Sequence, residues 1–392
     1  MVTPSRIALA RKRRGLTLAE LSDRAGVSMQ SLSNYETGRT APRAGTLNKL
    51  ASALDFPAAF FQGPPLEELP ADGISWRARS KASPRVLDAA RAAGTLGATL
   101  YDWIAESFRL PVVDVPSLGK PDPETAAGMV RTRWELGEAP APNMVHLLEA
   151  HGVRVFSLDP DHAEVDAFAV WRDGVPFVFL NTLKSAERGR FDAAHELGHL
   201  VMHGSEHACS GPDAERQANA FASAFLMPRA SVLGHMPSGA HVDQIIRGKR
   251  IWKVSAMALT YRMHDLGLLT DWQYRSTCAE LSRLGFRSAE PEGMGQRETS
   301  QVLTKVFAAL RAKGVRPSTV AAEVGLTGEE MNRLLFGLTL TTVAGGGQQT
   351  VSTSKRHLST VGSPTSGSAG STAAPARLSS RRSGLHGAPL RG

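Results

Sequence analysis

Apolar residues recur at three- and four-residue spacing along most of the chain, a pattern that predicts a largely helical protein. The first run of this pattern covers residues 4–61 and ends at GPPLEELPADG, where three prolines and two glycines interrupt it. We therefore expect an N-terminal helical domain in residues 1–62, followed by a linker in residues 63–74.

The second region changes from helical to strand-like spacing and back. Helices are expected at residues 84–107, 123–136 and 143–151. VRVFSL then predicts a strand, and DAFAVWR and VPFVFLN flank Asp173-Gly174, a pair that supplies the positive φ angles of a type I′ hairpin turn. The expected fold is α+β and mostly α, with a small antiparallel sheet before a helix that contains RFDAAHELGHLVMHG, residues 190–204.

The central domain is expected to span residues 75–290, and the chain beyond it falls into two segments. In residues 291–340, STVAAEVGLTGEEMNRLLFGL predicts two short helices separated by a glycine turn. A second DNA-binding unit would place Glu329 and Glu330 against phosphates, so a small helical packing module is the preferred interpretation. Residues 341–392 are rich in Ser, Thr, Gly and Ala, and we expect them to be disordered.

Charge is distributed unevenly along the chain, whose net charge is +8. Residues 1–63 hold nine Lys or Arg against four Asp or Glu, and residues 341–392 hold six Lys or Arg and no acidic residue. The middle of the chain is therefore slightly acidic. A nucleic-acid partner is expected for a basic end of the chain and not for its middle.

Composition narrows the class of protein further. A chain of 392 residues with 42% apolar content can bury more than one core. It has no apolar run of the roughly 18 residues that a membrane helix needs, and its first residues lack the apolar segment of a secretory signal. The two cysteines, Cys209 and Cys278, have neither metal nor redox spacing. We expect a cytoplasmic protein without a membrane span or a disulfide framework.

Capping and turn residues typical of two short helices that meet at a sharp angle occur in LTLAELSDRAGVSMQSLSNYETG. Thr17 and Glu20 form a capping box, Gly26 permits the turn, and Ser28 caps the second helix. The residues expected to fill the core between the two helices are Leu18, Leu21, Val27 and Leu32.

The exposed face of the second helix is a candidate for reading base edges in the major groove. The expected base contacts are Met29, Gln30, Ser33 and Asn34, and the expected phosphate contacts are Arg11, Lys12, Arg13, Arg14, Arg39 and Arg43. Patterning alone also fits a small helical bundle with a solvated basic face. However, RRGLTLAELSDRAGVS, LSNYETGRTAPR and LNKLASALDFPAAFF, within residues 7–61, resemble the Xre (Cro/CI-like) helix-turn-helix family. This resemblance implies a five-helix domain that binds a duplex DNA operator as a homodimer.

The helix that contains HELGH is a candidate metal site. Residues four apart lie one turn apart on nearly the same face, so His195 and His199 can present both imidazoles to one ion. Glu196 lies about 100° from His195 and could accept a proton from a water molecule at that ion. Ala193, Leu197, Leu200 and Val201 are expected on the opposite, buried side. The same pattern also occurs in ordinary surface helices.

A further ligand is expected from SGPDAERQANAFASAFLMP, which predicts a second helix with a Ser210 cap. Glu215 could complete a tetrahedral site, and Asn219, one turn on, could orient a ligating histidine. The competing ligands are His203, His207, Cys209 and Asp213. We interpret His203, His207 and Cys209 as a helix end and a solvent loop.

KSAERGRFDAAHELGHLVMH followed by ERQANAFASAFLMP resembles the ImmA/IrrE family of zinc metallopeptidases, whose HExxH and ExxA(N/D) motifs are both present. The resemblance implies one zinc ion held by His195, His199 and Glu215 in a zincin-like domain, with Glu196 as the general base. From about Ile7 to Leu340 the chain resembles regulators in which an Xre domain is fused to such a peptidase. The basic tail has no counterpart in that pattern.

The expected function is transcriptional regulation combined with zinc-dependent cleavage of a protein, either this chain at its linker or a partner. The substrate is expected to lie extended along an edge of the hairpin at residues 166–181. Cleavage would pass through a tetrahedral intermediate with a negatively charged oxygen. By side-chain type alone, the candidates to stabilise this oxyanion are Tyr261, Arg262 and His264. The alternatives are a regulator whose peptidase-like domain senses a ligand or metal without cleaving, and an antitoxin-like repressor with a protein partner.

Overall fold

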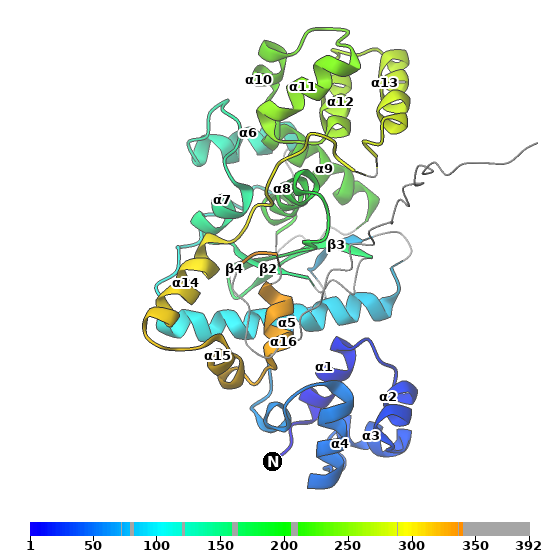
Figure 1. The fold of residues 1–392 in the computed structure, drawn as a ribbon, viewed down its shortest axis with the longest axis vertical. Coiled ribbons are helices and arrows are strands. Elements are labelled where there is room, and N and C mark those ends of the chain that lie inside the picture. Colours follow the sequence, from blue (N-terminus) through cyan, green and yellow to red (C-terminus); the bar gives the residue numbers. More distant parts are fainter. Residues whose placement is uncertain are drawn as a thin grey trace, which may run out of the picture. The chain divides into compact units, whose positions relative to one another are not determined.

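The structure is a computed structural model (Figure 1). It describes residues 1–71, 73–78, 82–119, 122–158, 164–204, 211–287, 289–335 and 337–339. The tail expected to be disordered, residues 341–392, lies outside the described residues, as do His207, Cys209 and Ser210. Among the described residues, no helix is long and apolar enough to cross a membrane.

The N-terminal domain is helical, and the signals read from its sequence are confirmed. Its elements are α1 (Pro4–Arg13), α2 (Leu18–Ala25), α3 (Met29–Glu36), α4 (Ala44–Leu54) and the 3₁₀ helix η1 (Ala58–Gln62). Thr17 and Glu20 form the capping box of α2, Gly26 ends it at a φ of 61°, and Ser28 caps α3. Leu21 and Leu32 are fully buried between these helices.

A four-stranded sheet forms the centre of the molecule, in the order β1-β3-β4-β2. The strands are β1 (Ser75–Ala78), β2 (Arg154–Ser157), β3 (Val165–Arg172) and β4 (Val175–Leu180). The hairpin of β3 and β4 is antiparallel, and Asp173 and Gly174 have φ angles of 49° and 73° as its turn requires. The sheet is nevertheless mixed, since β2 pairs with β4 in parallel. The expectation of an antiparallel sheet was wrong because the spacing of a strand does not specify which neighbour it pairs with.

Helices cover both faces of this sheet (Figure 1). The long helix α5 (Pro84–Ser107) packs on one face, where Gly94 and Gly97 allow close contact with Phe168 and Phe179. The helix α8 (Ala186–Met202) packs on the other face against β3 and β4. The remaining central helices are α6 (Pro123–Arg133), α7 (Met144–Ala150), α9 (Pro212–Leu226), α10 (Arg229–His235), α11 (Val242–Trp252), α12 (Ala256–Asp265) and α13 (Asp271–Arg283).

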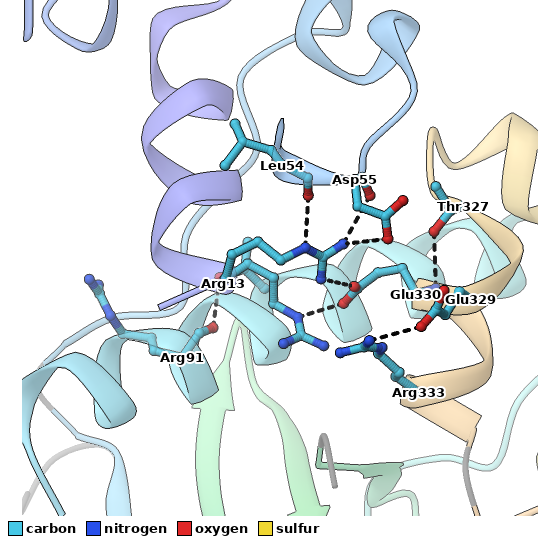
Figure 2. A network of polar contacts seen from close by, with 10 residues as sticks. Arg13, Leu54, Asp55, Arg91, Thr327, Glu329, Glu330 and Arg333 are labelled. Atoms are coloured by element: carbon cyan, nitrogen blue, oxygen red, sulfur yellow. Dashed lines mark hydrogen bonds and ion pairs between the residues drawn. The ribbon is translucent and has the colours of Figure 1, made fainter. Parts of the chain in front are cut away.

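The C-terminal helices join the N-terminal domain to the central region. They are α14 (Gln301–Ala312), α15 (Pro317–Glu323) and α16 (Gly328–Leu335). Glu330 of α16 is fully buried and accepts hydrogen bonds from Arg13 Nε at 2.5 Å and from Arg14 Nη1 at 2.6 Å (Figure 2). A buried glutamate with two internal partners fits the packing module expected from the sequence, because that carboxylate is not available to a nucleic acid.

The same contacts correct the expected phosphate-binding residues. Arg13 is 1% exposed, and Arg14 is held by Glu330 and by the Leu54 carbonyl. Arg11 donates to both oxygens of Glu36, and Lys12 Nζ lies 3.9 Å from Glu68. Arg11, Arg13 and Arg14 serve contacts within the protein, which a count of charges along the sequence cannot reveal, whereas Lys12 stays partly exposed.

The linker expected after the N-terminal domain is packed where the structure describes it. Thr3 Oγ1 donates to the Gly63 carbonyl at 2.5 Å, and Arg6 Nε donates to the Pro64 carbonyl at 2.6 Å. Leu69 is 1% exposed, and its backbone amide donates to Thr95 Oγ1 of α5. The segment is therefore held against the protein before and after Pro65.

Candidate metal centre and nucleic-acid interface

Three potential ligand atoms converge between α8 and α9. His195 Nε2 and His199 Nε2 are 3.0 Å apart, and Glu215 places one carboxylate oxygen 3.1 Å from His199 Nε2 and the other 3.4 Å from His195 Nε2. A tetrahedral zinc ion with bonds of about 2.0–2.1 Å separates its ligand atoms by about 3.3 Å. The three residues therefore have the spacing of three corners of such a site.

The helix pair holds this spacing through close packing. A Cβ added to Gly198 of α8 would lie 3.0 Å from the ring of Phe221 of α9, so glycine lets the two helices approach. We expected α8 to be buried on one side only. This was wrong, because every residue from Asp192 to Met202 is buried. Both flanks of the helix are covered, since α9 packs against one side and the sheet against the other.

Burial also sets the ionisation of the ligands. Burial, with a contribution from the nearby Arg77 charge, lowers the pKa of His195 to about 3, so its imidazole is neutral near pH 7. Partial burial opposes the ionisation of Glu215, but hydrogen bonds with both histidines outweigh it and hold the pKa of Glu215 well below its usual range. A neutral imidazole and an ionised carboxylate are the forms in which His195 and Glu215 would bind a metal ion.

Polar side chains behind the ligands fix the two rings. Asn219 Oδ1 lies 3.1 Å from His195 Nδ1, and His203 Nδ1 lies 3.0 Å from His199 Nδ1. Gln217 Oε1 in turn lies 2.9 Å from His203 Nε2. His203 ends α8, as the interpretation of a helix end expected, but it is 5% exposed and faces His199 instead of solvent. Its position one helical turn after His199 is the sequence signal that could have indicated this contact.

Asp213, the remaining competitor for the metal, lies away from the ligand atoms. It is exposed and forms an ion pair with Arg216 on the surface of α9. Among the described residues, the one group of three or more His, Cys, Asp or Glu with the geometry to hold a metal ion is His195, His199 and Glu215.

Glu196 is fully buried, and neither of its carboxylate oxygens has a hydrogen-bond partner among the described residues. Burial raises the pKa of Glu196 well above its usual range. An unpartnered buried carboxyl group is costly unless a donor reaches it. A water molecule held at the three ligands would supply such a donor, so the residues present fit a metal site that carries water.

Arg77 is a residue of this site that the sequence analysis missed. It lies on β1, where its Nε is 3.0 Å from Asp192 Oδ1 and its Nη1 donates to Asn219 Oδ1 at 3.3 Å. It thus links the sheet to both helices of the candidate centre. No local pattern signals this role, because its partners follow more than 100 residues later in the chain.

The three residues considered for the oxyanion occupy different environments. Arg262 is 1% exposed and pairs with Glu124, and His264 pairs with Asp271. Tyr261 is half exposed and lines a cavity of about 640 Å³ that Arg77 and Asn219 also line. Of the three residues, Tyr261 is the one that shares a cavity with residues contacting the candidate centre.

The candidate DNA-reading residues lie on and after α3. Met29 and Gln30 are exposed in its first turn, while Ser33 and Asn34 are partly exposed one turn later. Gln30 Nε2 donates to Asn34 Oδ1 at 3.3 Å, which holds both amides on one face. The two further cations expected at phosphates, Arg39 and Arg43, are exposed in the loop before α4.

Comparison with protein families finds two matches. Residues 7–61 match the family model described as helix-turn-helix, and residues 148–264 match the model described as IrrE N-terminal-like domain, a peptidase family. A sequence comparison with curated proteins found no match. The two matched segments contain α3 and the His195, His199 and Glu215 cluster, respectively.

Proposed function

We propose that this chain, which joins an Xre-type helix-turn-helix domain to a domain of the IrrE peptidase family, is a DNA-binding regulator that cleaves another regulatory protein by zinc-dependent hydrolysis. The observation that carries the proposal is the convergence of His195, His199 and Glu215 beside the unpartnered carboxyl group of Glu196. A site that only retained a metal ion would not need a buried acid at this position.

The donor set favours zinc. Imidazole nitrogens together with one carboxylate are frequent ligands of catalytic zinc, and three protein ligands leave one position open. Zinc, when bound, would polarise the carbonyl of a peptide bond and make water a stronger nucleophile near pH 7. The protein then has to orient the rings, move a proton and position the substrate.

Glu196 would perform the proton transfer. Its carboxylate accepts a proton from the attacking water and returns it to the nitrogen of the leaving amine. Asn219 and His203 hold the imidazoles of His195 and His199 in fixed orientations. Tyr261 and Arg77, which line the adjoining cavity, are the polar side chains placed to contact the substrate near the scissile bond.

The expectation that the substrate lies along an edge of the hairpin at residues 166–181 was wrong. The hairpin strands β3 and β4 are both interior, because β1 pairs with β3 and β2 pairs with β4. Within the described residues, β1 pairs on one side only and carries Arg77, which contacts Asn219. We therefore place the substrate along β1, where strand addition would align a peptide bond with the ligands.

A partner protein is the favoured substrate. The prolines of residues 63–74 resist strand pairing, and hydrogen bonds from Thr3 and Arg6 hold Gly63 and Pro64. Cleavage of this chain at its own linker would first require those contacts to break. Intact-mass analysis of zinc-loaded protein, with and without DNA, would detect any self-cleavage.

Removing both histidines is expected to remove the metal. The variant with His195→Ala and His199→Ala should lose the one zinc ion per chain measured by metal analysis, and with it all cleavage of proteins in a lysate of the source cells. His241→Ala, which alters an exposed histidine outside the centre, is the control and should keep the metal. Stoichiometric zinc in the double variant would overturn the ligand assignment.

DNA binding is expected to depend on α3 and the loop after it. A variant with Gln30→Ala, Asn34→Ala and Arg39→Ala should bind the upstream region of its own gene at least about tenfold more weakly in mobility shifts, since each base or phosphate contact contributes about 1–3 kcal/mol. Arg275→Ala, an exposed arginine of α13, is the control. Equal binding by the two variants would show that another surface contacts DNA.

A further inference from the structure

We infer that the cavity beside the metal centre is an anion-accepting subsite that binds an acidic side chain of the protein substrate. This inference rests on the proposed peptidase function and adds the chemistry of the segment that is cut. The cavity has a volume of about 640 Å³ and is bounded by the start of α8, by α9, by α12 and by residues 286, 287, 289 and 290. It is large enough for a side chain and the backbone that carries it.

The cavity shares a wall with the metal centre. Asn219 and Arg77 both line it, and Asn219 Oδ1 is 3.1 Å from Nδ1 of the ligand His195. Ser223, one turn after Asn219 on α9, also lines it. The ligand residues themselves do not line the cavity, so we expect a peptide whose scissile carbonyl lies at the ligands to reach this space past Asn219 with a nearby side chain.

Basic side chains dominate the charge of the wall. They are Arg77, Lys184, Arg188, Arg216 and Arg287. The two acidic lining residues already have partners: Glu290 accepts from Lys249 Nζ and from the Ala256 amide, both at 2.8 Å, and Glu187 accepts from the Met294 amide.

Two of these cations are open to a ligand. Arg188 and Arg287 are exposed, and neither forms an ion pair with a described residue. Arg77 pairs with Asp192, Lys184 pairs with Asp166 and Asp192, and Arg216 pairs with Asp213. The wall thus offers two cations without a carboxylate, whereas the charges of Arg77, Lys184 and Arg216 are matched by Asp166, Asp192 and Asp213.

Two helices add to the positive electrostatic potential in the cavity. The caps of α8 and α12, Ser185 and Ser255, both line the cavity, so the positive ends of two helix dipoles face it. The backbone amides of the first turns point in the same direction as the dipoles. An anion in the cavity is therefore favoured by backbone as well as by side-chain charge.

Ser223 indicates, separately from the charges and the helix ends, that the cavity binds a ligand. It is 3% exposed and lines the cavity, yet its hydroxyl has no hydrogen-bond partner in the part of the chain that the structure describes. A buried hydroxyl without a partner is unfavourable. A carboxylate oxygen in the cavity would accept a hydrogen bond from it.

An acidic side chain fits the cavity better than a free inorganic anion. The wall also contains apolar groups of Phe191, Met257 and Phe286, which can pack against the methylene groups of a glutamate. Because Asn219 lines the cavity and also contacts the ligand His195, the carboxylate and the scissile bond can belong to one peptide. We therefore expect Glu or Asp within a few residues of the cut.

Binding is tested first, with zinc-loaded, full-length Glu196→Gln protein so that the probe is not consumed. Two fluorescent eight-residue peptides differ only in carrying two Glu or two Gln. We expect the Glu peptide to bind at least about tenfold more tightly, the effect of one charged hydrogen bond. Adding Arg188→Glu and Arg287→Glu should remove this preference, and adding Ser223→Ala should reduce it. Arg247→Glu with Arg275→Glu, an equal charge change away from the cavity, should leave it unchanged.

Cleavage is tested second, by sequencing the new termini that wild-type protein forms in a peptide mixture digested from a whole proteome. Asp and Glu should be enriched near the cut, and the variant with Arg188→Glu and Arg287→Glu should lose this enrichment. The subsite would be overturned if the Glu and Gln peptides bound equally tightly. It would also be overturned if millimolar phosphate bound to the protein but displaced neither peptide. A Glu preference without any cleavage would uphold the subsite and reject the peptidase, whereas cleavage without acidic enrichment would do the reverse.

Discussion

Replacing Glu196 with Gln is expected to leave zinc bound and to lower the rate of protein cleavage by about 10²–10⁴-fold, the usual contribution of a general base. The amide has nearly the shape of the carboxyl group but cannot accept the proton of the attacking water. Glu196 contacts none of the three candidate ligands through a hydrogen bond or ion pair that involves its own carboxylate, so the metal should stay. The measurements are zinc content and the new peptide termini formed in a lysate.

The control for this variant is Glu280→Gln, which changes an exposed glutamate of α13. It should match the wild-type protein in both measurements. Full cleavage by the Glu196 variant would reject the mechanism. If neither the wild-type protein nor the variant forms new termini although both hold zinc, the domain is a sensor of a ligand or metal, and its effect should appear in DNA affinity instead.

Replacing Glu330 with Gln is expected to lower the free energy of unfolding by about 3–5 kcal/mol, because it breaks a buried ion pair and removes the carboxylate that faces Arg13. Glu330 is fully buried and Arg13 is 1% exposed, so water cannot replace the lost partner (Figure 2). The loss should fall first on the contact between α1 and α16. Denaturant unfolding measures the total effect, and faster proteolysis within residues 63–74 would report release of the N-terminal domain.

Glu329→Gln is a matched control one residue away. Glu329 is half exposed and pairs with Arg333 at 2.9 Å on the surface of α16, so its loss should cost less than about 0.5 kcal/mol. The double variant Arg13→Met with Glu330→Leu should recover part of the stability by replacing charges with apolar contacts. Similar effects of the Glu329 and Glu330 substitutions would show that the ion pair does not hold the two parts together.

Local signals predicted most of the elements that carry the candidate sites. The capping box at Thr17 and the glycine at 26 located the helix pair, and the Asp173-Gly174 turn located the hairpin. In each case the residue type and the backbone conformation are linked by sterics or by one short hydrogen bond. The spacing of His195 and His199 is equally local, because one helical turn separates them.

What the sequence could not predict depends on contacts between distant segments. Glu330 lies 317 residues after Arg13, and nothing near either residue indicates that their charges meet. Arg77 reaches the metal helices from a separate strand. The parallel pairing of β2 with β4 is set by the path of the whole chain around the hairpin. Charge and spacing identify candidates, whereas packing determines which of them are available.

The close approach of α8 and α9 at Gly198 has a consequence for ion selectivity. Phe221 is fully buried against this glycine, so moving the helices apart would open a void in a close-packed core. The spacing of the ligand atoms is thereby held near the value for bonds of about 2 Å. Ca²⁺ takes six to eight oxygen atoms at about 2.3–2.6 Å, and Mg²⁺ requires an octahedron of oxygen atoms. We therefore expect neither ion to fit two nitrogens and one carboxylate at this spacing, and the absence of a side chain at Gly198 would contribute to discrimination against these hard cations.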